Sequence, residues 1–230
     1  MPPMITHTAI AIAIAIDGPV ASGKSAVGRL VAGRLGYRFI DTGVMYRALT
    51  WLALERGVEC NDEAALTQLA TAAQLQLADG EDGVTRVLLD CIDVTEQLRS
   101  PDVGESVSLV SRVAGVRQAM VELQRKIAAE ADTVMVGRDI GTVVLTDAKL
   151  KVYLDATAEE RVRRRYRELL AAGKAASEDE VREELALRDT IDSGRDASPL
   201  RPAEDAIIIH TDDLSLEGVV DKVLELVQCR

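Results

Sequence analysis

Short apolar runs recur along the chain, separated by longer segments in which apolar residues follow a helical period. The first run, Ala9 to Ile16, alternates Ala with Ile, so both faces of a strand here would be apolar. This is typical of a central strand in a parallel sheet that is covered on both sides. Similar runs predict strands over residues 37–40, 133–136, 150–154 and 206–210. Five strands alternating with helices predict an α/β fold of three layers, α/β/α, around a five-stranded parallel sheet.

The helices between these strands are predicted from apolar spacing and from residues that begin or end helices. Apolar residues from Val27 to Leu35 share one helical face, and Gly36 follows as a stop, as Gly57 does for the next helix. Thr157 and Ser177 each precede a Glu by three residues, which predicts a capping box at the start of two helices. Further helices are predicted over residues 44–56, from 61 or 62 to about 73, 101–110, 113–131 and 216–227.

One segment departs from the α/β alternation. Two strand-like runs, residues 75–78 and 84–89, flank Asp79-Gly80-Glu81-Asp82-Gly83, which is rich in turn-forming residues. An antiparallel hairpin of this kind does not fit a parallel sheet. The pattern therefore predicts a small inserted domain.

A glycine-rich stretch lies directly between the first strand and the first helix. It reads Gly18-Pro19-Val20-Ala21-Ser22-Gly23-Lys24-Ser25, which is Gly-x-x-x-x-Gly-Lys-Ser. A polyphosphate needs converging backbone N–H groups, a helix N-terminus and a cation, and Gly18, Gly23 and Lys24 supply them. The Ser25 hydroxyl is placed to hold Mg²⁺. The alternative is a glycine-rich turn that happens to carry a lysine, and the flanking strand and helix favour a phosphate-binding loop.

Composition narrows the class of protein. The 230 residues, 47% apolar and 28% charged, fit one globular domain with insertions or two small domains. A net charge of −11 disfavours binding to a nucleic-acid polymer, which needs many Lys and Arg residues. A small phosphorylated ligand requires only a local group of Arg side chains.

Cysteine usage and the N-terminal segment bear on location. The three cysteines have no metal-like spacing, which predicts a reducing compartment, the cytoplasm, without disulfides. No Lys or Arg precedes the first apolar run, which argues against a signal peptide. The sequence contains no run of eighteen or more apolar residues, so no membrane span is predicted.

Arginines are the candidates for holding further phosphates, because phosphoryl transfer depends on positioning and charge neutralisation. Asp41, Thr42 and Arg47 follow the second strand, and Arg138 and Asp139 follow the third. Because ligands of parallel sheets bind at the carboxyl ends of strands, these residues are expected in the site. Asp139 could serve a Mg²⁺-bound water, a base edge or a turn, and spacing does not decide among these. The arginines between residues 161 and 167 could equally form a solvated helix surface.

Four segments together resemble bacterial cytidylate kinases, of the nucleoside monophosphate kinase group. They are Ile16-Asp17-Gly18-Pro19 with the loop that follows, Asp41-Thr42-Gly43-Val44-Met45-Tyr46-Arg47, Gly137-Arg138-Asp139-Ile140-Gly141-Thr142-Val143-Val144, and Arg188-Asp189 with Asp192 and Arg195. The resemblance spans nearly the whole chain in order. This chain has Val136 where relatives often carry an acid, and Thr42 where Ser is frequent.

The resemblance implies transfer of the γ-phosphoryl group of ATP to CMP or dCMP, with ATP and Mg²⁺ as co-substrate and cofactor. The residues implied for ATP are 18–25 and Arg161, with Ser25 at the metal. Those implied for the acceptor phosphate are Thr42, Tyr46, Arg47, Arg138 and Arg188. Those implied for cytosine are Ser108, Arg117 and Asp139, and for sugar and base Asp192 and Arg195. Those implied in catalysis are Lys24, Arg138, Arg164 and Arg188.

The resemblance also implies a division of the chain. A core phosphate-loop domain would comprise residues 1–42, 113–157 and 172–230, a monophosphate-binding region 43–112, and a lid 158–171. The expected assembly is a monomer. Two other functions stay open from the residues alone: a kinase for another small acceptor such as UMP, and a regulatory NTPase that needs no acceptor.

Overall fold

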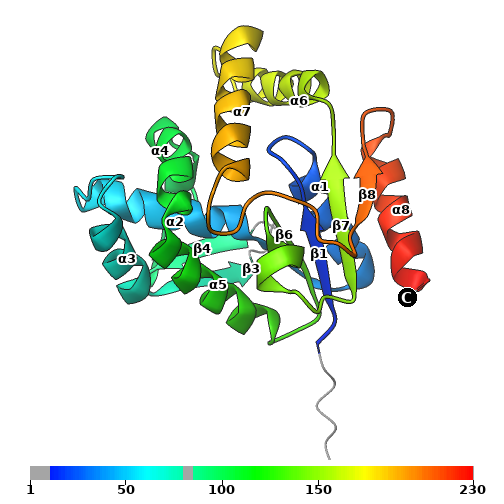
Figure 1. Ribbon diagram of the computed structural model, residues 1–230, viewed down its shortest axis with the longest axis horizontal. Helices are drawn as coiled ribbons and strands as arrows, with labels where there is room; N and C mark the ends of the chain where they lie inside the picture. The colour runs from blue at the N-terminus through cyan, green and yellow to red at the C-terminus, as the bar shows by residue number, and fades with distance from the viewer. Residues whose placement is uncertain (1–10, 80–84, 230) are drawn as a thin grey trace, which may run out of the picture.

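The computed structural model describes residues 11–79 and 85–229, and its centre is a parallel sheet (Figure 1). The five strands run in the order β2-β6-β1-β7-β8, and every neighbouring pair is parallel. They are β1 (Ala13–Asp17), β2 (Arg38–Asp41), β6 (Thr133–Gly137), β7 (Leu150–Asp155) and β8 (Ile207–His210). The predicted fold class is thereby confirmed. Residues 9 and 10 of the predicted first strand lie outside the described residues.

Strand β1 separates two apolar layers, as its Ala/Ile alternation predicts. Ile14 and Ile16 pack into one layer with α1 (Lys24–Leu35) and α8 (Leu216–Gln228). Ala15 faces the other layer. That layer is built with α2 (Thr42–Glu55), α3 (Glu63–Ala72), α4 (Pro101–Arg112) and α5 (Ala114–Ala128). The single tryptophan, Trp51 on α2, is half-buried against this second layer.

The segment predicted as an antiparallel insertion forms a second, three-stranded sheet. Its strands are β3 (Leu75–Asp79), β4 (Thr85–Leu89) and β5 (Ile92–Asp93). The turn residues 80–83 and the first residue of the predicted second run lie outside the described residues. Strand β5 was not predicted, because its connection to β4 is made by Asp90 and Cys91. Both have positive φ (50° and 67°) without the glycine that usually marks such a turn.

Helices α6 (Ala158–Ala171) and α7 (Glu178–Ser193) lie beyond the carboxyl ends of the sheet strands (Figure 1). They share a small apolar cluster of Val162, Val181 and Leu185. Ser177 and Glu180 complete the predicted capping box of α7.

The capping box predicted at Thr157 is only half formed. Its hydroxyl accepts a hydrogen bond from the Glu160 N–H, but the Glu160 carboxylate pairs with Arg163 and Arg164. The Thr157 N–H donates to Asp212 instead. Nearby arginines therefore outcompete the backbone for this carboxylate.

Two observations concern the surroundings of the protein. Within residues 11–79 and 85–229, no helix combines the length and apolar character needed to cross a membrane. Cys60, Cys91 and Cys229 are free thiols, the first half-buried and the other two exposed.

Candidate active site

The phosphate loop connects β1 to α1 with a backbone that requires glycine at two places. A Cβ atom on Gly18 would lie 2.3 Å from the Leu154 carbonyl oxygen. Gly23, at the N-terminus of α1, has a φ of 89°, in the left-handed region. The Lys24 Nζ atom donates to the Pro19 carbonyl at 3.0 Å, so the lysine folds back over the loop. The buried Ser22 hydroxyl has no hydrogen-bond partner within the described residues, and a phosphate on the loop would supply one.

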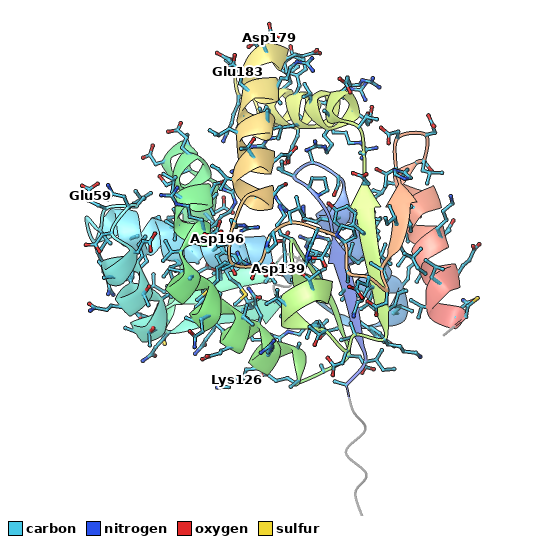
Figure 2. The ribbon with its side chains drawn as sticks, in the orientation of Figure 1. Glu59, Lys126, Asp139, Asp179, Glu183 and Asp196 are labelled. Atoms are coloured by element: carbon cyan, nitrogen blue, oxygen red, sulfur yellow. The ribbon has the colours of Figure 1, made fainter. Side chains whose placement is uncertain are left out.

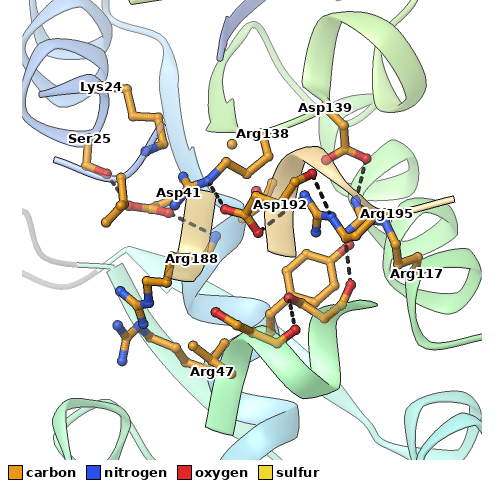
Figure 3. A pocket seen from close by; sticks show the side chains of 18 residues that line it. Lys24, Ser25, Asp41, Arg47, Arg117, Arg138, Asp139, Arg188, Asp192 and Arg195 are labelled. Carbon is orange, nitrogen blue, oxygen red and sulfur yellow. Dashed lines mark hydrogen bonds and ion pairs between the residues drawn. The ribbon is translucent and has the colours of Figure 1, made fainter. Parts of the chain in front are cut away.

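A cavity of about 200 Å³ adjoins the loop at the carboxyl ends of β2 and β6 (Figure 3). It is lined by every residue predicted to bind the acceptor, together with three residues of the loop and first helix. The predicted acceptor residues are Thr42, Tyr46, Arg47, Ser108, Arg117, Arg138, Asp139, Arg188, Asp192 and Arg195. Loop and helix contribute Val20, Lys24 and Ser25. Residues spread over much of the sequence therefore converge on one hollow.

Two aspartates hold arginines in place around this cavity. Asp192, near the end of α7, accepts from the Arg138 Nε atom at 2.8 Å, and its other oxygen lies 3.5 Å from Arg195 Nη2. Asp139 accepts from Arg117 Nη2 at 2.5 Å, and both of these side chains are buried. Figure 2 places Asp139 below α7, far from Asp179 and Glu183 at the other end of that helix. The ion pairs that Asp192 and Asp139 form orient the planar guanidinium groups of their arginines for a ligand.

Positive charge is concentrated in the same hollow. Burial lowers the pKa of Arg47, and the neighbouring Arg188 guanidinium lowers it further. Burial also lowers the pKa of Arg188, with Arg138 acting in the same direction. Arg117 Nε and Arg195 Nη2 are buried without a hydrogen-bond partner in the described part of the chain. An anionic ligand would relieve this repulsion and complete these hydrogen bonds.

Lys24 responds most strongly to this environment. Burial, followed by repulsion from Arg138, lowers its pKa from 10.5 to about 7. A phosphate beside it would favour the charged form again.

Arg161 and Arg164 lie elsewhere than the cavity. Arg161 reaches the Val20 carbonyl at 3.4 Å and pairs with Asp189 at 2.7 Å. Arg164 reaches the Ser22 carbonyl at 3.4 Å and donates to the carbonyl of Thr211 at 2.7 Å. Both therefore join α6 to the phosphate loop, and their roles towards ATP stay predictions.

Two carboxylates at strand ends received no defined role from the sequence. The Asp41 carboxylate accepts from the Ser25 hydroxyl at 2.7 Å and from the Gly43 N–H at 2.9 Å. Its position as the last residue before a helix was the available signal. Asp17, the last residue of β1, is buried and bonds to the backbone of residues 140 and 141. No local signal indicates that contact, because it joins segments more than a hundred residues apart.

Comparison with known proteins agrees with this geometry. The family model described as cytidylate kinase matches residues 14–229. A cytidylate kinase from Carboxydothermus hydrogenoformans is 48% identical over 93% of this chain and 96% of its own length. One from Bacillus licheniformis is 44% identical over 94% of this chain and 96% of its own length.

A solved structure is similar in fold alone. It is an uncharacterized protein from Eubacterium ventriosum, with a TM-score of 0.52 and 12% identity, covering 95% of this chain and 99% of that one. The family model and the sequence relatives, each covering most of the chain, decide the family. The chain belongs to the cytidylate kinase family.

Proposed function

We infer that this chain is an ATP-dependent kinase that transfers the γ-phosphoryl group to CMP or dCMP, giving ADP and CDP or dCDP. Its family membership over residues 14–229 carries this conclusion. The cavity beside the phosphate loop supports it, because an acceptor bound there would lie next to Lys24. The alternatives of a kinase for another acceptor or a regulatory NTPase are not favoured.

The acceptor phosphate would bind between the arginines of the cavity. Arg47, Arg138 and Arg188 converge there, and guanidinium groups hold phosphate oxygens bidentately. Thr42 and Tyr46 would support the same group from the start of α2. The Thr42 hydroxyl donates to the Val136 carbonyl at 2.9 Å, so it would have to turn its hydrogen towards a phosphate oxygen, which accepts.

The base would be read deeper in the cavity. A carboxylate such as Asp139 can accept a hydrogen bond from the cytosine N4 amino group, whereas Arg117 and Ser108 can donate to O2 and N3. The 2.5 Å contact between Arg117 and Asp139 holds the two side chains next to each other in the lining of the cavity. Asp192 and Arg195 would contact sugar and base.

The donor would lie on residues 18–25, with its phosphates on the loop amides and Lys24. The oxygens of Ser25 and Asp41, which are 2.7 Å apart, fit Mg²⁺, a hard cation that takes one or two protein oxygens beside phosphate oxygens. Ser25 would hold it, with Asp41 next to it. When bound, the ion neutralises charge on the transferring group.

The chemical step needs no covalent enzyme intermediate. An oxygen of the acceptor phosphate forms the new bond to the γ-phosphorus as the bond to the bridging oxygen of ADP breaks. Lys24, Arg138, Arg164 and Arg188 would stabilise the charge of the transition state, with Arg161 holding ATP. The lid, residues 158–171, would exclude water, which would otherwise hydrolyse ATP.

A single assay tests the proposal. The protein is incubated with Mg·ATP and each of CMP, dCMP and UMP, and the nucleotides are separated. We expect ADP and CDP or dCDP in equal amounts, and much less UDP. ATP hydrolysis that is independent of CMP would contradict the kinase, and equal use of UMP would contradict the cytosine preference.

The remaining expectations are also proposals. We expect the domain division given above, a cytoplasmic location and a monomer. Sedimentation at micromolar concentration tests the monomer, and a species of twice the 24.8 kDa chain mass would contradict it.

A further inference from the structure

Asp17 forms a contact that links the donor loop to the acceptor side. It is the last residue of β1, immediately before Gly18, and its side chain is buried. Its Oδ1 atom accepts from the Ile140 N–H at 2.8 Å and its Oδ2 atom from the Gly141 N–H at 2.7 Å. Both carboxylate oxygens are thus engaged by consecutive backbone amides.

Those amides begin a turn that follows two residues of the acceptor site. The turn, η2 (Ile140–Val144), is π-helical and directly follows Arg138 and Asp139. The ladder between β1 and β6 ends at the pair Asp17 and Gly137. Beyond that point the Asp17 carboxylate continues the connection between the two chain segments. It does so without lining the cavity itself.

The contact is close on both sides. A Cβ atom on Gly141 would lie 3.3 Å from Asp17 Oδ2 and 3.2 Å from Lys151 Cδ, so glycine allows the approach. Burial raises the pKa of Asp17 from 3.8 to about 6, although both N–H bonds oppose the shift. Charged and titratable groups face it from three directions: Asp139 before η2, Lys24 on α1, and Tyr153 on β7. A buried carboxylate held at this cost indicates a role for its position.

We propose that Asp17 is a positioning residue of the acceptor site, which fixes the turn behind Arg138 and Asp139 against the phosphate loop. The affinity for CMP and the preference for cytosine then depend on a side chain that contacts neither the nucleotide nor its base. The inference rests on the proposed function.

Asp17→Asn tests the proposal. An asparagine oxygen can accept from one amide, but its NH₂ group faces the other donor, so the turn loses one anchor. We expect kcat/KM for CMP to fall by about tenfold or more, which is what the loss of one buried charged hydrogen bond produces. The ratio of CMP to UMP use should fall with it, whereas the Kd for ATP should change less than threefold. Hydrogen exchange at the amides of Ile140 and Gly141 should accelerate.

Asp132→Asn is the matched control. The Asp132 carboxylate accepts from the Ile12 N–H at 2.6 Å, at the opposite end of β1 from the loop. Its removal should leave the kinetics of CMP and UMP within twofold of the wild type. Loss of ATP affinity equal to that for CMP in Asp17→Asn, or unchanged CMP/UMP preference, would overturn the proposal. A wild-type protein that makes no CDP would instead overturn the proposed function.

Gly141→Ala disturbs the same contact from the other side and covers the case in which Asp17→Asn does not fold. We expect the same direction of change in CMP/UMP preference, but smaller. Gly33→Ala, which meets nothing within 4 Å, controls for helix and glycine effects. If Gly141→Ala keeps the wild-type preference, the proposal is wrong.

The pH profile supplies a readout that a purely structural role would not move. Because the pKa of Asp17 is raised to about 6, the side chain is charged above that pH and neutral below it. The KM for CMP in the wild type should therefore rise as pH falls through 6. In Asp17→Asn this limb should become smaller, because only the second ionisation of the CMP phosphate, with a pKa of about 6, then remains. A limb of equal size in both proteins would contradict the proposal.

Discussion

The phosphate loop and the acceptor cavity are neighbours that are built in opposite ways. The loop is eight consecutive residues, 18–25, whose shape is set by the backbone of Gly18 and Gly23. Beyond its contacts with the loop and α1, the cavity takes its side chains from β2, α2, α4, α5, the segment after β6, and α7 with the residues that follow it. Its shape is set by ion pairs such as Arg138 with Asp192.

This difference between a backbone-built loop and a cavity of paired side chains determines how each region binds its ligand. In the loop, the Lys24 amine has to exchange the Pro19 carbonyl for a phosphate oxygen, and the Ser25 hydroxyl has to exchange Asp41 for the metal. Arginines of the cavity already have partners, so a bound nucleotide must be fitted into an existing network. Changes in the loop should therefore impair transfer itself, and changes in the cavity should impair choice and affinity of the acceptor.

Lys24→Ala should have the largest effect. Removing the cation from the transferring group should lower kcat by about 10²- to 10³-fold or more. Binding of CMP, measured by calorimetry without ATP, should stay largely intact. An equal loss of CMP affinity and turnover would erase the distinction between the two regions.

Arg188→Ala should act mainly on the acceptor. Loss of a guanidinium that binds phosphate should lower kcat/KM for CMP by about 10- to 100-fold, with a smaller change in the Kd for ATP. Arg182→Ala, an exposed arginine on the same helix, is the matched control and should behave as the wild type. Equal loss of ATP and CMP affinity would count against the assignment.

Asp139→Asn should change the choice of base. An amide can donate to the uracil O4 atom, whereas the carboxylate accepts from the cytosine amino group. We expect the ratio of kcat/KM for CMP to that for UMP to fall by about 5- to 100-fold, in assays with both acceptors. Thermal unfolding should be recorded in parallel, because the variant also loses the Arg117 ion pair. An unchanged ratio would remove Asp139 from base recognition.

The smallest expected effect is the uptake of a proton by Lys24 when ATP binds. The pKa of Lys24 is lowered to about 7, so at pH 8 most of the free protein has a neutral lysine there. Phosphate favours the charged form, so binding at pH 8 should take up protons. The calorimetric enthalpy should then vary with the ionisation heat of the buffer. Lys24→Met should abolish that variation, and its persistence would assign the proton to another group.

Most of the fold could be predicted, because its signals are local. The Ala/Ile alternation of β1 predicts two apolar layers, and the structure places Ile16 and Ala15 in different ones. The loop, its helix and the stop at Gly36 each depend on adjacent residues. Apart from β5, what escaped prediction depends on distant partners. The strand order is one case, and the turn at 140–144, held by Asp17, is another.

The candidate site was predictable only in part. Arg47 and Arg138 could be placed at strand ends from the residues alone, but Ser108 and Arg117 came from the family resemblance. A helical residue such as Arg117 gives no local sign that it will face Asp139. Val136, where relatives often carry an acid, proves to be buried, and its side chain packs near Gly28 on α1. An acid there would be desolvated among apolar side chains.

Trp51 gives the protein a built-in optical reporter. Because the chain has a single tryptophan, its tryptophan fluorescence comes from one position on α2, the helix that also carries Tyr46 and Arg47. One turn of α2 separates the fluorophore from the hollow that those residues line. We therefore expect that filling of that hollow by a pyrimidine nucleotide changes the intrinsic fluorescence of the unlabelled enzyme, which a titration would record.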